Sequence, residues 1–276
     1  MRLATISHRG TRTTVVSSGD DGWRTTRTPL LDLIGGASPH ADGESVNVGP
    51  HNLLAPYRPP TLFGIGLNYH DTVQEMGWEV PKKPYLFPKL SSSVTGPYDP
   101  VEVDPAVTAR ADWEAELGVV IGKPLRRATP EQALAAVFGY VAANDISARD
   151  LQAADGQWVR GKGLDTFCPL GPWLVTVDEV PDPQDVSLRT WYNGTLVQDG
   201  TSKSMIFGVA ELIAYCSRWF TLSPGDVILT GTPAGCGDFR TPRMALTPGD
   251  LVEIEVGTLG RQRNPVIGPD AAEHGG

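Results

Sequence analysis

Glycine and proline recur along the whole of this 276-residue chain and leave little room for long helices. The sequence contains 31 glycines and 24 prolines. Proline breaks a helix interior, and glycine weakens regular structure while favouring turns. Hydrophobic residues make up 40% of the chain and charged residues 20%, proportions that are ordinary for a globular protein and argue against disorder. We therefore expect a folded protein of the α+β class in which short strands predominate.

Local patterns predict several of these elements. Asn193-Gly194 lies between two strand-like runs and is typical of a type I′ hairpin turn. Residues 252–256 alternate between apolar and acidic side chains, which predicts a strand with one wet face. Thr129-Pro130-Glu131-Gln132 has the cap, proline and glutamine positions of a helix start. Apolar spacing from Leu212 to Phe220 predicts a second helix that continues until Ser223-Pro224-Gly225.

A change of pattern near residue 58 suggests a domain boundary. Tyr57-Arg58-Pro59-Pro60 is typical of a linker, because consecutive prolines restrict the chain to extended conformations. Residues 1–58 are weakly patterned, and we expect a small N-terminal domain there. Residues 59–268 are predicted to form the larger, catalytic domain, and residues 269–276 a flexible tail.

Charge and hydropathy narrow the range of partners. The formal net charge is −9, which disfavours nucleic acid because binding to it rests on Lys and Arg neutralising phosphates. No apolar run approaches the ~20 residues of a membrane span, and no signal peptide is recognisable at the start. We expect a cytoplasmic protein that binds neither nucleic acid nor membrane. The three cysteines are far apart and are expected to be buried, free thiols.

Three acidic residues in apolar sequence form the main candidate site. Glu114 and Glu116 lie in the strand-like run 112–122, where alternation places them on the same face, ~7 Å apart by the ~3.3 Å rise per residue. Asp145 lies in the apolar run 140–147 that follows the predicted first helix. A buried charge without a partner costs several kcal/mol, and a hard cation with oxygen ligands is one suitable partner.

A simpler arrangement accounts for the same acids. Glu114 and Glu116 could face solvent while Asp145 forms an ion pair with Arg149 or Arg110, since acidic strand edges and structural ion pairs are common. Residue types alone leave both interpretations open.

The order and spacing of several motifs resemble the fumarylacetoacetate hydrolase family. The resemblance covers about residues 60–267. Within the family, the chain is most similar to the vertebrate fumarylacetoacetate hydrolase domain-containing protein 2-like group, as residues 96–98 and 166–172 suggest. It implies a mixed β-roll or β-sandwich catalytic domain and a homodimer. The motifs are Gly66-Leu67-Asn68-Tyr69, Pro84-Tyr85-Leu86-Phe87-Pro88-Lys89, Asp112-Trp113-Glu114-Ala115-Glu116-Leu117, Asn144-Asp145-Ile146-Ser147-Ala148-Arg149-Asp150, Lys162 and Ile228-Leu229-Thr230-Gly231-Thr232-Pro233.

The resemblance also implies roles for residues at matching positions. Glu114, Glu116 and Asp145 are the implied metal ligands, for Mg²⁺ or Mn²⁺, or for Ca²⁺. Lys162 is the implied acid–base group. Substrate contacts are implied for Tyr69, Lys89, Arg149, Gln152, Gly231 and Thr232.

Charge bookkeeping is consistent with a small anionic 2-oxo acid as substrate. One divalent cation and three carboxylates carry one net negative charge, so the substrate would need nearby cations, which Lys89, Arg149 and Lys162 could supply. Alternatives remain for two of them. Lys162, between two glycines, could be a mobile surface residue, and Arg149 could form an ion pair with Asp150 or Asp155.

One position departs from the family pattern. Many hydrolytic members carry a histidine that activates water together with a glutamate three residues later, and the residue here is Thr72 with Glu75 retained. Threonine cannot accept a proton near neutral pH as histidine does. His70 is a candidate replacement, although residues two apart on a helix do not share a face.

This departure affects the expected reaction rather than the metal. The family resemblance implies metal-dependent hydrolysis of C–C bonds in 2-oxo or 1,3-dioxo carboxylates through a metal-bound enolate. Isomerisation, tautomerisation or decarboxylation of 2-oxo dicarboxylates, of the oxaloacetate or 2-hydroxymuconate type, needs only the enolate and a proton relay, so Thr72 favours these reactions. A third hypothesis is a catalytically silent protein that binds metal and ligand.

Overall fold

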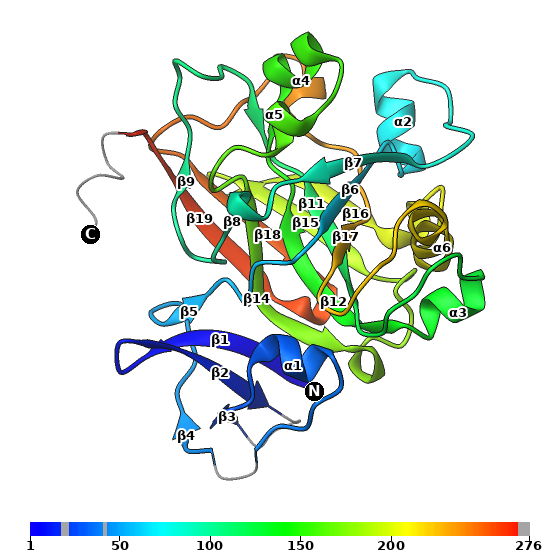
Figure 1. Ribbon diagram of the computed structural model, residues 1–276. Coiled ribbons are helices and arrows are strands. Elements are labelled where there is room, and N and C mark those ends of the chain that lie inside the picture. The colour runs from blue at the N-terminus through cyan, green and yellow to red at the C-terminus, as the bar shows by residue number, and fades with distance from the viewer. Residues whose placement is uncertain (18–21, 41–42, 270–276) are drawn as a thin grey trace.

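A large mixed sheet runs through the computed structural model, which describes residues 1–17, 22–40 and 43–269. Figure 1 shows the sheet from the N-terminal strands to the end that carries β7. Its strands in spatial order are β4 (Ser45–Val46), β3 (Trp23–Thr26), β2 (Thr11–Ser17), β1 (Arg2–His8), β14 (Cys168–Thr176), β12 (Val137–Asn144), β11 (Ala115–Ile121), β17 (Val227–Leu229), β6 (Leu62–Gly66) and β7 (Tyr85–Lys89), with β5 (Leu53–Leu54) beside β1 and β8 (Val94–Thr95) beside β14.

A second sheet packs against the middle of the first. It consists of β16 (Thr195–Thr201), β15 (Ser187–Tyr192), β18 (Leu251–Val256), β19 (Arg261–Ile267) and β9 (Val101–Glu102). Leu117 and Val119 of β11 share a buried apolar cluster with Leu188 of β15 and Ile254 of β18. Because β11 is covered on both faces, all seven of its residues are buried. The mostly β, α+β fold class is confirmed.

In the part of the chain that the structure describes, six short α-helices surround the sheets. They are α1 (Leu30–Ile34), α2 (His70–Met76), α3 (Pro130–Leu134), α4 (Arg149–Asp155), α5 (Val159–Lys162) and α6 (Val209–Trp219). Figure 1 shows α2, α4 and α5 together at the end of the molecule opposite the N-terminal strands. Within the described residues, no helix is long and apolar enough to cross a membrane.

Most of the locally encoded elements are confirmed. Thr129 and Gln132 form the predicted capping box of α3. Asn193 and Gly194 have φ angles of 49° and 79°, as a type I′ turn requires. The residues of β18 alternate between half-buried and buried as expected, and the three cysteines are free and buried.

The end predicted for the second helix is wrong. α6 stops at Trp219, and Phe220 is extended, with φ −120° and ψ 150°. The reason is a long-range pairing, because Leu222 exchanges backbone hydrogen bonds with Leu125.

The two strand-like runs that carry the acidic residues are interrupted at residues 113–114 and 145–146, whereas Glu116 lies within β11. The two-stranded sheet of β10 (Ala111–Asp112) and β13 (Ser147–Ala148) adjoins β11 and β12. At the junction the Glu114 amide donates to Asn144 Oδ1 at 2.9 Å, and the Asp145 amide donates to the Glu114 carbonyl at 2.9 Å. The junction therefore holds Glu114 and Asp145 side by side.

The N-terminal residues are attached to the main sheet by backbone hydrogen bonds. β1 pairs antiparallel with β14, and Tyr57 in the expected linker is buried. The domain division at residue 58 stays a prediction. The predicted flexible tail lies, apart from Pro269, outside the described residues.

Candidate active site

Three buried carboxylates converge where β11 and β12 leave the large sheet. Glu114, Glu116 and Asp145 are 7%, 1% and 0% exposed. One carboxylate oxygen from each lies within 4.8 Å of the others. The alternative in which the two glutamates face solvent is therefore wrong, and so is the pairing of Asp145 with Arg149 or Arg110, because the cations that contact Asp145 are lysines.

Two buried lysines contact this carboxylate cluster. Lys162 Nζ, at the end of α5, lies 2.5 Å from Glu114 Oε2 and 2.7 Å from Asp145 Oδ2. Lys89 Nζ, at the end of β7, lies 2.8 Å from Asp145 Oδ1 and donates a hydrogen bond to the Lys162 carbonyl. Lys162 is 1% exposed, so it is not the mobile surface residue that its flanking glycines allow.

Arg149 joins the cluster to a neighbouring loop. Its Nη2 atom lies 2.7 Å from Glu114 Oε1, and its Nε atom donates to Asp112 Oδ2 at 2.9 Å. Asp112 also accepts hydrogen bonds from the amides of Gly237 and Asp238, which ties Arg149 to that loop.

The alternative partners of Arg149 are engaged elsewhere. Asp155 pairs with Arg160, and Asp150 accepts from the Thr108 hydroxyl and the Ala109 amide. Arg149 is therefore part of the buried site rather than of a surface pair.

The buried charges favour the uptake of a cation or a proton. Four carboxylates, including that of Asp112, face three cationic side chains, which leaves one net negative charge when all are ionised. Burial, with Asp145 and Glu114 nearby, raises the pKa of Glu116 well above its usual value. Burial also tends to raise the pKa of Asp145, but Lys162 and Lys89 outweigh it and lower that pKa.

The donor set fits a hard divalent cation. All three convergent groups are carboxylates, the ligands that Mg²⁺, Mn²⁺ and Ca²⁺ prefer. Asp145 Oδ1 is buried and makes no hydrogen bond of regular geometry despite its contact with Lys89. The cluster could therefore hold a metal ion.

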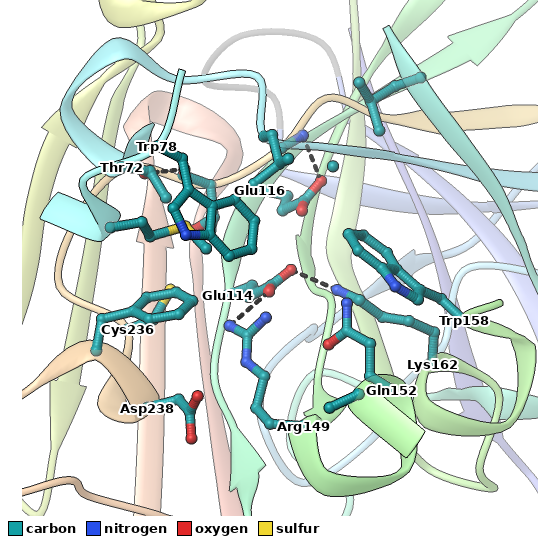
Figure 2. A pocket seen from close by; sticks show the side chains of 18 of the residues that line it. Thr72, Trp78, Glu114, Glu116, Arg149, Gln152, Trp158, Lys162, Cys236 and Asp238 are labelled. Carbon is teal, nitrogen blue, oxygen red and sulfur yellow. Dashed lines mark hydrogen bonds and ion pairs between the residues drawn. The ribbon is translucent and has the colours of Figure 1, made fainter. Parts of the chain in front are cut away.

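A cavity of about 250 Å³ opens above this cluster (Figure 2). Its charged floor includes Glu114, Glu116, Arg149 and Lys162. Its remaining wall is largely apolar, and the larger apolar side chains are those of Ile65, Leu67, Met76, Trp78, Trp158 and Phe239.

Some residues singled out in the sequence line the cavity, but their polar atoms have protein partners. The Thr72 hydroxyl is buried and donates to the Thr232 carbonyl at 2.7 Å. The Gly231 amide donates to Glu116 Oε2 at 2.7 Å. Gln152, in the middle of α4, also lines the cavity.

Other predicted residues lie outside the cavity wall. His70 begins α2 and is exposed, and Glu75 is exposed and accepts from the Gly235 amide at 3.0 Å. Tyr69 is fully buried, and Lys89 lies behind the carboxylates. The roles assigned to all these residues stay predictions.

Several cavity residues were not identified from the sequence. Trp78, Trp158 and Phe239 form much of the apolar wall. Gly66 of the motif Gly66-Leu67-Asn68-Tyr69 was an indirect sign of a close neighbour, because a Cβ atom there would lie 2.6 Å from Cζ3 of Trp158. Phe239 gave no such signal, since only the fold brings its loop to the cavity.

Comparisons with known proteins agree with this geometry. The family model for the fumarylacetoacetate (FAA) hydrolase C-terminal region matches residues 61–267. A 2,4-didehydro-3-deoxy-L-rhamnonate hydrolase of a Sphingomonas species is 49% identical over 207 residues, which is 74% of this chain and 72% of that protein. The mitochondrial oxaloacetate tautomerase fahd2 of Xenopus laevis is 47% identical over 219 residues, 78% of this chain and 68% of that protein.

A solved structure matches the whole architecture. The fumarylacetoacetate hydrolase of Exiguobacterium antarcticum superposes with a TM-score of 0.89 at 38% identity, covering 97% of this chain and 99% of that one. The match includes the N-terminal strands as well as the part that carries the carboxylates. The chain therefore belongs to the fumarylacetoacetate hydrolase family and is an enzyme.

Proposed function

We propose that this enzyme interconverts the keto and enol tautomers of a small 2-oxo acid with the help of a divalent cation held by Glu114, Glu116 and Asp145. The observation that carries the proposal is the position of Lys162, whose Nζ atom reaches the floor of the cavity and contacts two of these carboxylates. Tautomerisation moves one proton between C3 and the keto oxygen, so it requires one well-placed proton carrier.

The described side chains suit this reaction. A bound divalent cation would polarise the keto oxygen of the substrate. The Arg149 guanidinium is suited to orienting the substrate carboxylate, because it presents a planar fork of donors at the cavity floor. Burial tends to lower the pKa of Lys162, but Asp145 and Glu114 outweigh it and raise that pKa, so Lys162 is an ammonium group. Lys162 can therefore give a proton to the substrate oxygen, while the Glu114 carboxylate takes up the proton released at C3 and returns it to Lys162 Nζ across 2.5 Å.

Hydrolysis of a C–C bond is the second candidate. The relative described as a hydrolase favours it. It also needs a base for water, and the residue at the expected position is Thr72, whose hydroxyl donates to a backbone carbonyl. His70 and Glu75 do not line the cavity. The hydrolysis that family resemblance places first is therefore less well supported than tautomerisation, which the Xenopus relative performs by its description.

The experiment follows the enol absorbance of several 2-oxo acids after addition of enzyme with Mg²⁺ or Mn²⁺. Parallel samples contain the metal alone, enzyme with EDTA, and the Lys162→Met variant. Faster loss of enol, with the keto acid as the only product by chromatography, supports the proposal. Cleavage products would instead establish the hydrolase, and binding without turnover the silent protein. A homodimer and a cytoplasmic location remain separate proposals, to be tested by light scattering and by fractionation of the source cells.

A further inference from the structure

We infer that the cavity selects a 2-oxo acid with a single carboxylate and a flat, apolar tail. This inference rests on the proposed function, since it concerns the substrate of the same site. It is carried by the contrast between the charged floor and the wall above it. Figure 2 shows Trp78 and Trp158 on either side of the space above Glu114.

Trp158 forms a wall of fixed shape. Its ring packs against Tyr85 and Phe87, with centroids 4.4 and 5.2 Å apart. Gly66 leaves room for it, because any Cβ atom there would meet the indole at 2.6 Å. A ring supported in this way offers a flat apolar surface to a ligand with little loss of side-chain entropy.

Trp78 covers the cavity from the other side and remains largely in contact with solvent. Trp78 comes directly after Gly77, the residue in left-handed conformation that ends α2, and it is 56% exposed. A large exposed aromatic residue at the mouth of a cavity gains from contact with an apolar ligand, because both then lose contact with water. An apolar tail lying toward Trp78 is therefore favoured.

The charged residues of the remaining wall, Arg110 and Asp238, are already paired. Arg110 donates to Asp238 through two hydrogen bonds, Nε to Oδ1 at 2.8 Å and Nη2 to Oδ2 at 2.6 Å. Such a bidentate pair satisfies both groups. Among the described residues, the other cations that line the cavity are Arg149 and Lys162 of the floor. Both contact floor carboxylates and would bind the substrate's first carboxylate.

A second carboxylate on the substrate would therefore lack a partner. It would meet aromatic rings and the Arg110–Asp238 pair, whose donors and acceptors already satisfy each other, and an unpaired buried carboxylate is costly. The cavity of about 250 Å³ is smaller than the roughly 300–1,000 Å³ of sites for drug-sized ligands, so the tail is limited to one ring or a short chain. This preference distinguishes the chain from its relative described as an oxaloacetate tautomerase.

The test compares phenylpyruvate, with one carboxylate and a flat tail, with oxaloacetate, which has two. With the wild-type enzyme and Mn²⁺, we expect kcat/KM for enol conversion to favour phenylpyruvate by about 10-fold or more, the range of discrimination by apolar pockets. Asp238→Asn frees Arg110, so the ratio should shift toward oxaloacetate by about 10-fold. Trp78→Ala should lower kcat/KM for phenylpyruvate about 10-fold more than that for oxaloacetate.

Matched controls separate these effects from general damage. Trp219 is 57% exposed and lies outside the cavity, so Trp219→Ala should leave the ratio unchanged. Asp155 makes a similar two-bond pair with Arg160 outside the cavity, so Asp155→Asn should also leave it unchanged.

The inference and the proposed function can fail separately. Turnover of oxaloacetate equal to or better than that of phenylpyruvate, or a ratio that Asp238→Asn leaves unchanged, overturns the inference while tautomerisation stands. If neither enol is converted, the proposed function fails, and dissociation constants from tryptophan fluorescence with the same two acids then decide the inference. Tighter binding of phenylpyruvate that Asp238→Asn reverses supports it, and equal or tighter binding of oxaloacetate overturns it.

Discussion

Replacing Lys162 by methionine tests the charge balance of the site without relying on activity. Methionine keeps an unbranched apolar stem of similar size, so the main change is loss of the ammonium group. Glu114 Oε2 and Asp145 Oδ2 then lose contacts of 2.5 and 2.7 Å. The number of cations facing the four carboxylates falls from three to two, which raises the net negative charge from one to two.

The expected cost is large in the absence of metal. Breaking a buried ion pair by removing one partner costs about 3–5 kcal/mol of unfolding free energy, because the remaining charge stays buried. Lys162 is 1% exposed, so solvent offers little screening. A divalent cation should offset part of this cost, since it binds the carboxylates that the ammonium has left. At about 100 times its dissociation constant, a cation that binds the folded state alone adds about 2.7 kcal/mol.

Urea unfolding followed by tryptophan fluorescence measures the unfolding free energy of each protein with and without the metal. In EDTA the variant should unfold about 3–5 kcal/mol more easily than the wild type. Saturating Mn²⁺ should stabilise the variant more than the wild type and so narrow this difference. Lys203→Met is a suitable control, because Lys203 pairs with Asp185 at 2.8 Å but is 62% exposed, and it should change stability little. If the variant loses less than about 1 kcal/mol of unfolding free energy in EDTA, well short of the cost of a broken buried pair, the charge argument is refuted. Equal stabilisation of both proteins by Mn²⁺ would refute it as well.

Three further changes test other parts of the site. Glu116→Gln removes one of the three convergent carboxylates. Titration calorimetry should show the affinity for Mn²⁺ reduced by about 10-fold or more, the effect typical of losing support at a metal site. Unchanged affinity would exclude Glu116 as a ligand. Gly66→Ala places a Cβ atom 2.6 Å from Trp158 and should lower stability by about 1–3 kcal/mol, as overpacking does; a neutral effect in urea unfolding would show that Trp158 is not held in place. Thr72→His puts an imidazole where the Thr72 hydroxyl now donates to Thr232, and chromatography should show increased cleavage of acylpyruvates; no gain in a folded variant would mean that position 72 does not decide the reaction.

Features that depend on neighbouring residues could be predicted from the sequence. The capping box of α3 and the turn at Asn193 each satisfy their own backbone hydrogen bonds or φ angles. Alternation along a strand likewise predicted that Glu114 and Glu116 share a face, and their carboxylates do converge, although Glu114 lies just before the first residue of β11. By contrast, α6 ends where Leu222 pairs with the distant Leu125, and no local pattern encodes that end.

The part of the cavity wall formed by Arg110, Asp238 and Phe239 could not be predicted for the same reason. Asp112 belongs to the motif at residues 112–117. Its carboxylate accepts hydrogen bonds from the amides of Gly237 and Asp238, more than a hundred positions away, and only the fold brings these residues together. Arg110 was one of two possible partners of Asp145 in the alternative interpretation, and instead it pairs with Asp238. The sequence therefore suggested what the floor of the site binds, whereas the fold was needed to see what its wall admits.

The buried charges connect the cation, the reaction and the choice of substrate. With all groups ionised, four carboxylates and three cations leave one negative charge, which burial makes unfavourable. A divalent cation would change this to one positive charge, and a 2-oxo acid with a single carboxylate would then bring the site to neutrality. A dicarboxylate would leave it negative again, with its second group facing the paired Arg110 and Asp238. The preference for a monocarboxylate thus follows from two independent features, the charge balance of the floor and the pairing of the wall, and Asp238→Asn alters the second while leaving the carboxylates and cations of the floor in place.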